Sequence, residues 1–438
     1  MSTDSNYYGH FFPVQEVGRF LKRHSQRPDK YREIGMRWLI EGKVTWQRFN
    51  SFGKPEHMIA DIQRRKPNAV YVGPTYNTDP TLRWVLGKER LHPVEQRLVF
   101  DVDLTDYDDL RTCECVAKTS GLRVCEKCWP LAAIAVIVLR NLLRYKFGFH
   151  EFLCTFSGNK GVHCWVLDQQ VLSYTDETRL NISEYFRPFM KGIYTHCVPL
   201  QLCPVLEQCY EQVVKPLFEQ HILGRVISFR TEHGQSLLHK VVQSHQHSPD
   251  FLQQLPSIPD ELELWRHIES KLREYTSEHV VRAVVMMCTF PRIDKDITTT
   301  MQHLIRCPFT VNGRGGRVCV PIRYQDALEF APELAPTAST IKDSLSDYLE
   351  ILEDALVAPW CKLWVCRVCE NSTNVENYKP ANIFHSQKEW KQHHEDVPHG
   401  RSHSAENSTA KAIALELDVN ATTSFKQTIY TSLLRIKL

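Results

Sequence analysis

Four cysteines within sixteen residues constrain the fold of this chain more than any other feature of its sequence: Cys113, Cys115, Cys125 and Cys128. The first thirty residues carry charges throughout and include no apolar stretch typical of a secretory signal, so we expect reduced thiols rather than disulfides. C-x-C and C-x-x-C pairs supply the four ligands of a closed tetrahedral zinc site. We therefore predict a structural zinc ion that ties down a loop over residues 113–128; the alternatives are free core cysteines or a redox pair.

A second group of metal-ligating residue types lies near the end of the sequence. Cys366-x-x-Cys369 is followed by an aromatic residue, a large apolar residue and histidines at the offsets of a zinc-finger helix, namely Phe384, Trp390, His393 and His399. His394 and His403 are competing ligands, and Cys361 is a bystander. We predict a zinc-finger-like module with Cys366, Cys369, His393 and His399 as ligands over residues 346–404, and a tail over 405–438.

Length and charge narrow the class of protein. A chain of 438 residues is longer than a single hydrophobic core usually supports, so we predict two or three domains. The formal net charge is only +2, but residues 1–100 contain 17 Lys and Arg against 10 Asp and Glu, which indicates a polyanionic partner. The longest apolar run, Leu131 to Leu139, is too short to cross a bilayer, so we expect a buried helix and no membrane partner.

Two aspartates interrupt the clearest strand of the sequence, Arg97 to Leu104. Asp101 and Asp103 are two residues apart and therefore project from the same face of a strand. A buried strand does not place two carboxylates side by side without a compensating cation, so we predict a site for one or two divalent ions. The alternative is a strand end with solvated acids, and we expect Asp106, Asp108 and Asp109 to form a solvated acidic turn.

A predicted hairpin follows about fifty residues later. Its strands, Phe152 to Phe156 and Val162 to Leu167, flank a loop with two glycines, and the loop and second strand carry a hydroxyl, a cation and an imidazole: Ser157, Lys160 and His163. These groups bind phosphate, and glycines let the backbone approach a ligand closely. His163 taken alone is more typical of a satisfied strand histidine than of a phosphate ligand.

The remaining pattern predicts a mixed α/β (α+β) fold built from separated stretches. Strands are expected at 32–52 with a turn at Gly42, a helix at about 130–146, and helical spacing over 178–286. Strand-like and loop segments return at 288–323. We therefore predict a core over 1–177, a helical subdomain over 178–286, and a second part of the core over 287–345.

The motifs LVFDVDLTDYDDLR, CEKCW, FSGNKGVHCWVLD and FPRIDKDITTTMQHLIRCPFTVNGRGGRVCVPI resemble, in order and spacing, the catalytic small subunit of eukaryotic DNA primase, a member of the archaeo-eukaryotic primase superfamily. The resemblance covers roughly residues 7–323 and implies that family's α/β catalytic core. It implies that Asp101, Asp103 and Asp294 bind catalytic Mg²⁺ or Mn²⁺. It also implies that Ser157, Lys160, His163, Arg306 and Arg48 contact the nucleotide. Asn159 and Asn312 stand where the family has basic residues.

The function implied by this resemblance is synthesis of short RNA primers from ribonucleoside triphosphates on single-stranded DNA, by two-metal nucleotidyl transfer. The implied partners are a large iron–sulfur primase subunit and the DNA polymerase alpha complex, and the implied location is the nucleus. Two alternatives stay open: a repair or translesion primase-polymerase of the same superfamily, and a non-catalytic zinc protein that binds nucleic acid. Primer length and template preference are not encoded in these motifs.

Overall fold

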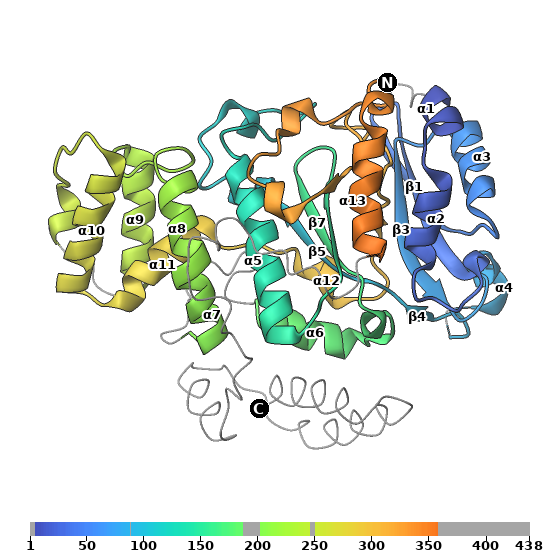
Figure 1. The fold of residues 1–438 in the computed structure, drawn as a ribbon, viewed down its shortest axis with the longest axis horizontal. Helices are drawn as coiled ribbons and strands as arrows, with labels where there is room; N and C mark the ends of the chain where they lie inside the picture. The colour runs from blue at the N-terminus through green and yellow to red at the C-terminus, as the bar shows by residue number, and fades with distance from the viewer. Residues whose placement is uncertain (1–4, 88, 187–201, 246–249, 358–438) are drawn as a thin grey trace, which may run out of the picture.

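The computed structural model describes residues 5–87, 89–186, 202–245 and 250–357. These residues form two antiparallel sheets and a group of helices to one side, so the predicted mixed α/β fold is confirmed (Figure 1). Within the described residues, no helix is long and apolar enough to span a bilayer. The four predicted ligands of the C-terminal module, Cys366, Cys369, His393 and His399, and the tail lie outside the described residues.

The first sheet has the order β2-β1-β3-β4, with β8 paired to β3. Its strands are β1 (Arg32–Ile40), β2 (Lys43–Asn50), β3 (Ala69–Tyr76), β4 (Pro93–Glu95) and β8 (Ile305–Arg306). Three N-terminal helices lie on one side of this sheet in Figure 1: α1 (Ser5–His10), α2 (Val14–Lys22) and α3 (Pro55–Arg65). The indole of Trp38 on β1 donates to the carbonyl of Arg65 on α3 (2.8 Å), which shows which face of the sheet α3 covers.

The predicted turn at Gly42 joins β1 to β2. Ile40 pairs with Lys43, so the loop has two residues, Glu41 and Gly42, and both have positive φ (50° and 77°). Such a turn matches the right-handed twist of the two strands and favours glycine at its second position. The short α4 (Arg83–Leu86) follows β3.

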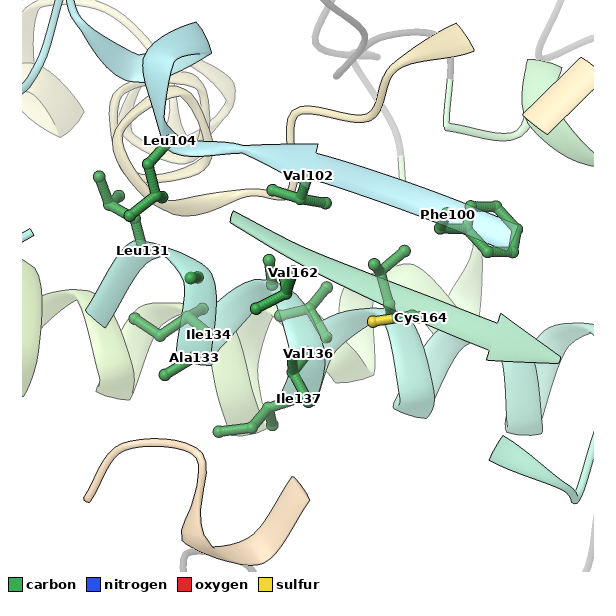
Figure 2. Packing of buried hydrophobic residues seen from close by; sticks show 14 of the residues in the cluster. Phe100, Val102, Leu104, Leu131, Ala133, Ile134, Val136, Ile137, Val162 and Cys164 are labelled. Atoms are coloured by element: carbon green, nitrogen blue, oxygen red, sulfur yellow. The ribbon is translucent and has the colours of Figure 1, made fainter. Parts of the chain in front are cut away.

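The second sheet has the order β5-β7-β6-β9, with strands β5 (Leu98–Asp103), β6 (Phe152–Phe156), β7 (Gly161–Val166) and β9 (Pro321–Ile322). The predicted helix at 130–146 is α5 (Trp129–Phe147), which packs against β5 and β7. Figure 2 shows Val162 of β7 directed at Ile134 and its neighbours on α5, with Val102 and Phe100 on the adjacent strand β5. Burial of these side chains, at about 1.5–3 kcal/mol each, holds β5 in place.

Helices dominate the middle of the chain, as the sequence pattern predicts. They are α6 (Asp176–Glu184), α7 (Pro204–Cys209), α8 (Lys215–Leu217), α9 (Glu232–His245), α10 (Glu261–Tyr275) and α11 (Glu278–Thr289), and two π-helical turns over 210–214 and 218–222 make 204–222 one continuous helix. The fully buried Trp265 lies 5.1 Å from the Phe218 ring and 5.6 Å from the Phe229 ring, at the centre of this group.

The chain then returns to both sheets. After α12 (Lys295–Thr299), β8 joins the first sheet and β9 joins the second. Residues 346–357 were predicted to open the C-terminal module, but they belong to α13 (Leu345–Val357), which packs on α2, β6 and β9. The apolar face of α13 is covered by the core, so this segment is a core element. The other domain boundaries stay predictions.

Candidate active site

The aspartate pair lies on β5 as the strand pattern predicts. Phe100 and Val102 face α5, so Asp101 and Asp103 project from the opposite face of the sheet. In the antiparallel pairing with β7, Asp101 lies opposite His163 and Asp103 lies opposite Gly161. Both aspartates are half-buried.

Asp294 joins this pair through the backbone. Its N–H donates to the carbonyl of Asp101 (2.9 Å), although 192 residues separate the two in sequence. The Asp294 carboxylate also accepts from the N–H of Asp296 (3.0 Å) and caps α12. The hydroxyl of Thr298 donates to the carbonyl of Val99 (3.0 Å), which fixes α12 against β5.

The three carboxylates form a site of concentrated negative charge. Burial, and then the charges of Asp103 and Asp294, raise the pKa of Asp101 well above its ordinary value. Asp101 Oδ1 is a buried oxygen with no hydrogen-bond donor. An unpartnered buried carboxylate oxygen among like charges is the environment that a bound divalent cation relieves, and carboxylates are the preferred ligands of Mg²⁺ and Mn²⁺. The residues present therefore fit such ions.

Positive and neutral groups of the next hairpin surround this site. Lys160 Nζ lies 2.5 Å from Asp103 Oδ2, and His163 Nε2 lies 3.6 Å from Asp101 Oδ1. Burial, together with the charges of Arg306 and Lys160, lowers the pKa of His163 to about 3. His163 is therefore a neutral imidazole at physiological pH, and its buried Nδ1 has no hydrogen-bond partner.

The hydroxyl of Ser157 is directed into its own loop. Ser157 Oγ accepts from the N–H groups of Lys160 (3.3 Å) and Gly161 (3.1 Å). Gly158 has a φ of 79°. A Cβ atom on Gly315 would lie only 2.0 Å from the carbonyl oxygen of Gly158, so the loop packs directly on the 312–317 turn. Ser157 thus shapes the loop; its contact with a triphosphate stays a prediction.

The two predicted arginines have different surroundings. Arg306 is 7% exposed on β8, and its Nη2 lies 3.3 Å from the hydroxyl of Tyr71. Its charge helps to lower the pKa of His163, so it belongs to the same group. Arg48 instead makes a bidentate ion pair with Glu33 (2.8 and 3.0 Å), a carboxylate buried in β1. Its role toward the nucleotide stays a prediction.

The segment that carries Asp294 is held by residues that sequence reasoning missed. Arg292 is buried, and its guanidinium donates to Asp109 Oδ2 (3.1 Å) and to the carbonyl of Asp106 (2.7 Å). Tyr107 accepts from the N–H of Arg292 (2.7 Å) and donates to the carbonyl of Phe290 (3.1 Å). Asp109 is exposed, as expected for a solvated acidic turn, but its carboxylate also pairs with Arg292 and so helps to hold the segment that carries Asp294. The sequence signal available was Pro291-Arg292 just before Asp294, and only the structure shows that this arginine is buried.

The four clustered cysteines come together. Their Sγ atoms all lie within 4.8 Å of one another, with 3.6 Å between Cys115 and Cys128 and 3.8 Å between Cys125 and Cys128. Sulfurs around a tetrahedral zinc ion are about 3.8 Å apart, given a Zn–S distance of about 2.3 Å. The set can therefore hold such a metal ion. The eleven cysteines of the described residues are free thiols in the structure.

Three comparisons bear on this arrangement. The family model described as DNA primase small subunit matches residues 100–324. The DNA primase small subunit of Saccharomyces cerevisiae is 30% identical over 354 residues, which cover 75% of this chain and 82% of the yeast protein. That of Drosophila melanogaster is 26% identical over 402 residues, 86% of this chain and 87% of the fly protein.

The chain belongs to the DNA primase small subunit family. The matched range of this primase-family chain includes all three carboxylates, the hairpin loop, Arg306 and the cysteine loop; Arg48 and the C-terminal cysteines and histidines lie outside it. Among solved structures, the polymerase domain of Mycobacterium tuberculosis ligase D in complex with DNA matches with a TM-score of 0.36 and 13% identity over 80% of this chain and 92% of that chain.

Asn159 and Asn312, which the sequence resemblance places where the family has basic residues, both have hydrogen-bond partners. Asn159 Oδ1 accepts from the N–H of Arg123 (3.1 Å), which links the hairpin loop to the cysteine loop. Asn312 Nδ2 donates to the carbonyl of Ser157 (2.9 Å), and its Oδ1 accepts from the N–H of Arg314 (3.0 Å). Both amides therefore fix the loop that carries Lys160.

Proposed function

We propose that this protein is the catalytic subunit of a DNA primase that makes short RNA primers on single-stranded DNA. The observation that carries the proposal is the convergence of Asp101, Asp103 and Asp294 beside Lys160, His163 and Arg306, in a chain of the primase small subunit family. The reaction joins a 3′-oxygen to the α-phosphorus of an incoming ribonucleoside triphosphate and breaks the α–β phosphoanhydride, with pyrophosphate as leaving group.

The chain's own groups support that reaction by position and charge. Mg²⁺ or Mn²⁺ held by the three carboxylates supplies activation of the 3′-hydroxyl and neutralisation of the leaving pyrophosphate. Lys160 and Arg306 are placed to neutralise triphosphate oxygens and the charge that develops in the transition state. His163, kept neutral by its surroundings, offers a hydrogen bond to a phosphate oxygen without adding charge. Catalysis is then mostly positioning.

The remaining implied properties belong to the same proposal. The cysteine loop holds structural zinc and braces the hairpin loop through Arg123 and Asn159. A basic N-terminal part follows the template backbone. The partners are a large iron–sulfur primase subunit and the DNA polymerase alpha complex, the location is the nucleus, and Cys366, Cys369, His393 and His399 bind a second zinc ion. These statements rest on family membership and sequence pattern.

The test is primer synthesis on a homopolymeric single-stranded DNA template with labelled ribonucleotides. Asp101→Asn/Asp103→Asn should lower product formation by at least about 10³-fold, since catalytic ions and their ligands supply several kcal/mol of transition-state stabilisation. The matched control, Glu350→Gln/Asp354→Asn, neutralises two exposed carboxylates on α13 and should leave product unchanged.

Equal product from the wild type and the aspartate variant would overturn the assignment of these acids. Parallel reactions with deoxynucleotides distinguish a replicative primase from a repair or translesion primase-polymerase. We expect this protein to incorporate ribonucleotides in preference to deoxynucleotides.

A further inference from the structure

One face of the first sheet carries aromatic rings between arginines. Arg37 on β1 lies directly opposite Trp46 on β2, and Tyr71 on β3 lies opposite Arg306 on β8. Arg37 and Gly35, which pairs with Tyr71, are two residues apart, so all four side chains share one face. Trp38, one residue on, is directed at α3. The shared face is therefore the one that α3 does not cover.

The four side chains form a continuous strip. The rings of Trp46 and Tyr71 are 4.9 Å apart with their planes tilted by 43°. The Arg37 guanidinium lies 5.7 Å from the centre of the Trp46 ring, and that of Arg306 lies 5.1 Å from the centre of the Tyr71 ring. Trp46 is 48% exposed. We call Arg37, Trp46, Tyr71 and Arg306 the aromatic strip.

The strip carries uncompensated positive charge. Within the described residues, neither Arg37 nor Arg306 makes an ion pair with a carboxylate. Burial lowers the pKa of Arg37, and the charges of Arg306 and of the exposed Arg314 lower it further, so three cations are close together. Arg48 on the same strand as Trp46 is neutralised by Glu33. The strip and the 312–317 turn beside it therefore carry positive charge that no carboxylate of the described residues pairs with.

One end of the strip reaches the candidate active site. Arg306 Nη1 donates to the carbonyl of Val311 (3.4 Å), and the next residue, Asn312, donates to the carbonyl of Ser157 (2.9 Å) in the hairpin loop of that site. From Arg306 the strip runs through Tyr71 and Trp46 to Arg37. Exposed ring faces between unpaired arginines are what proteins present to a single nucleic-acid strand: bases stack on the rings, and phosphates contact the cations. An apolar protein partner would instead bury these charges without counterions, at high cost.

We propose that the aromatic strip binds single-stranded template DNA as it enters the active site. Bases stack on the exposed Trp46, and Arg37 and Arg314 contact the phosphates. This inference rests on the proposed function, because it names the surface along which the template of that reaction lies.

The first test is binding of fluorescein-labelled oligo-dT to the full chain, measured by fluorescence anisotropy at fixed salt. Trp46→Ala should weaken binding roughly tenfold, the scale of losing one base-stacking platform. Trp46→Phe should restore most of the affinity, because it keeps a ring face. Trp84→Ala is the matched control: Trp84 is 87% exposed but lies outside the strip, on α4.

The second test measures the salt dependence of the same binding. Arg37→Gln should reduce the slope of log K against log salt by about one, the change expected for one lost phosphate contact. Arg64→Gln is the control, because Arg64 is an equally basic residue on α3, which covers the other face of the sheet. This variant should leave the slope unchanged.

Measurements of oligo-dT binding and of primer synthesis distinguish the template-strip inference from the proposed catalytic function. Asp101→Asn/Asp103→Asn should bind oligo-dT as the wild type does and make no primer. If Trp46→Ala and Arg37→Gln bind oligo-dT like the wild type, the strip is not the template surface, whatever the aspartate variant does. If the two substitutions weaken binding of oligo-rU but not binding of oligo-dT, the assignment of the strip to template DNA is equally overturned.

Discussion

At the scale of single residues, the site is defined by charges that the fold keeps close together. Asp101 has a pKa raised by burial and by Asp103 and Asp294, whereas His163 has a pKa lowered to about 3 by burial and two cations. A raised carboxyl pKa means that the folded chain binds the proton more tightly than the unfolded chain does. Stability is then greatest below the ordinary carboxyl pKa of about 4 and is lost as pH rises through the raised value.

Asp101→Asn should therefore stabilise the protein in buffer without divalent ions at pH 7.5. The amide removes a repelling charge and can donate to the neighbouring carboxylates, so Tm should rise by a few degrees, given about 2–4 °C per kcal/mol. Millimolar Mg²⁺ or Mn²⁺ should raise the Tm of the wild type but not that of the variant. Differential scanning fluorimetry with and without each ion makes the measurement, and a variant that melts below the wild type without ions would contradict it.

At the scale of elements, two loops brace the strands that carry the chemistry. The cysteine loop is joined to the hairpin loop by Arg123 and Asn159, and buried Arg111 donates to the sulfurs of Cys115 (3.6 Å) and Cys128 (3.4 Å). Such hydrogen bonds stabilise thiolates, the form that binds metal. The cysteine loop therefore supports the hairpin loop of the candidate active site.

Cys125→Ser should lose one equivalent of zinc per chain relative to the wild type, measured by elemental analysis of the full chain. The wild type should contain two equivalents if the C-terminal cluster also binds zinc, and a value near one would remove that second site. Because a structural metal contributes folding free energy, the variant should be less stable and less soluble, with a smaller effect on activity than the aspartate variant. Cys203→Ser, outside the cluster, should keep all of its zinc.

At the scale of the whole molecule, each sheet combines strands that precede the helical region in sequence with one strand that follows it. β8 pairs with β3 and β9 pairs with β6, so residues 305–322 close the structure that residues 32–166 begin. α13 then packs on α2 as well as on β6 and β9, and Glu353 pairs with Arg19. The C-terminal end of the described chain thus joins the N-terminal helices to the second sheet.

Leu352→Ala should lower the free energy of unfolding by about 2–5 kcal/mol, because Leu352 is fully buried in the contact that α13 makes. Leu334→Ala provides the comparison, since Leu334 is 82% exposed and its truncation should change stability by less than about 0.5 kcal/mol. Urea denaturation followed by tryptophan fluorescence measures both. Similar midpoints for the two variants would show that α13 does not stabilise the core.

Local sequence patterns were sufficient to predict the local geometry. The two-residue period of a strand puts Asp101 and Asp103 on one face, the spacing of four cysteines brings their sulfurs together, and the apolar run at 131–139 forms the buried α5. Each of these depends on residues near one another in the chain, so periodicity and spacing suffice. The roles of Asp294, Arg48 and Arg306 came from the family resemblance and not from the residues themselves.

Only the tertiary structure decided which distant residues meet. Asp294 reaches Asp101 through a backbone hydrogen bond, Glu33 holds Arg48, and Asp109 holds Arg292. The tertiary structure also surrounds His163 so that its imidazole is neutral. It brings together the four residues of the aromatic strip from strands before and after the helical region. These outcomes depend on which charges become buried together when the chain returns to its sheets, and the free energy of a buried charge is set by its neighbours in space.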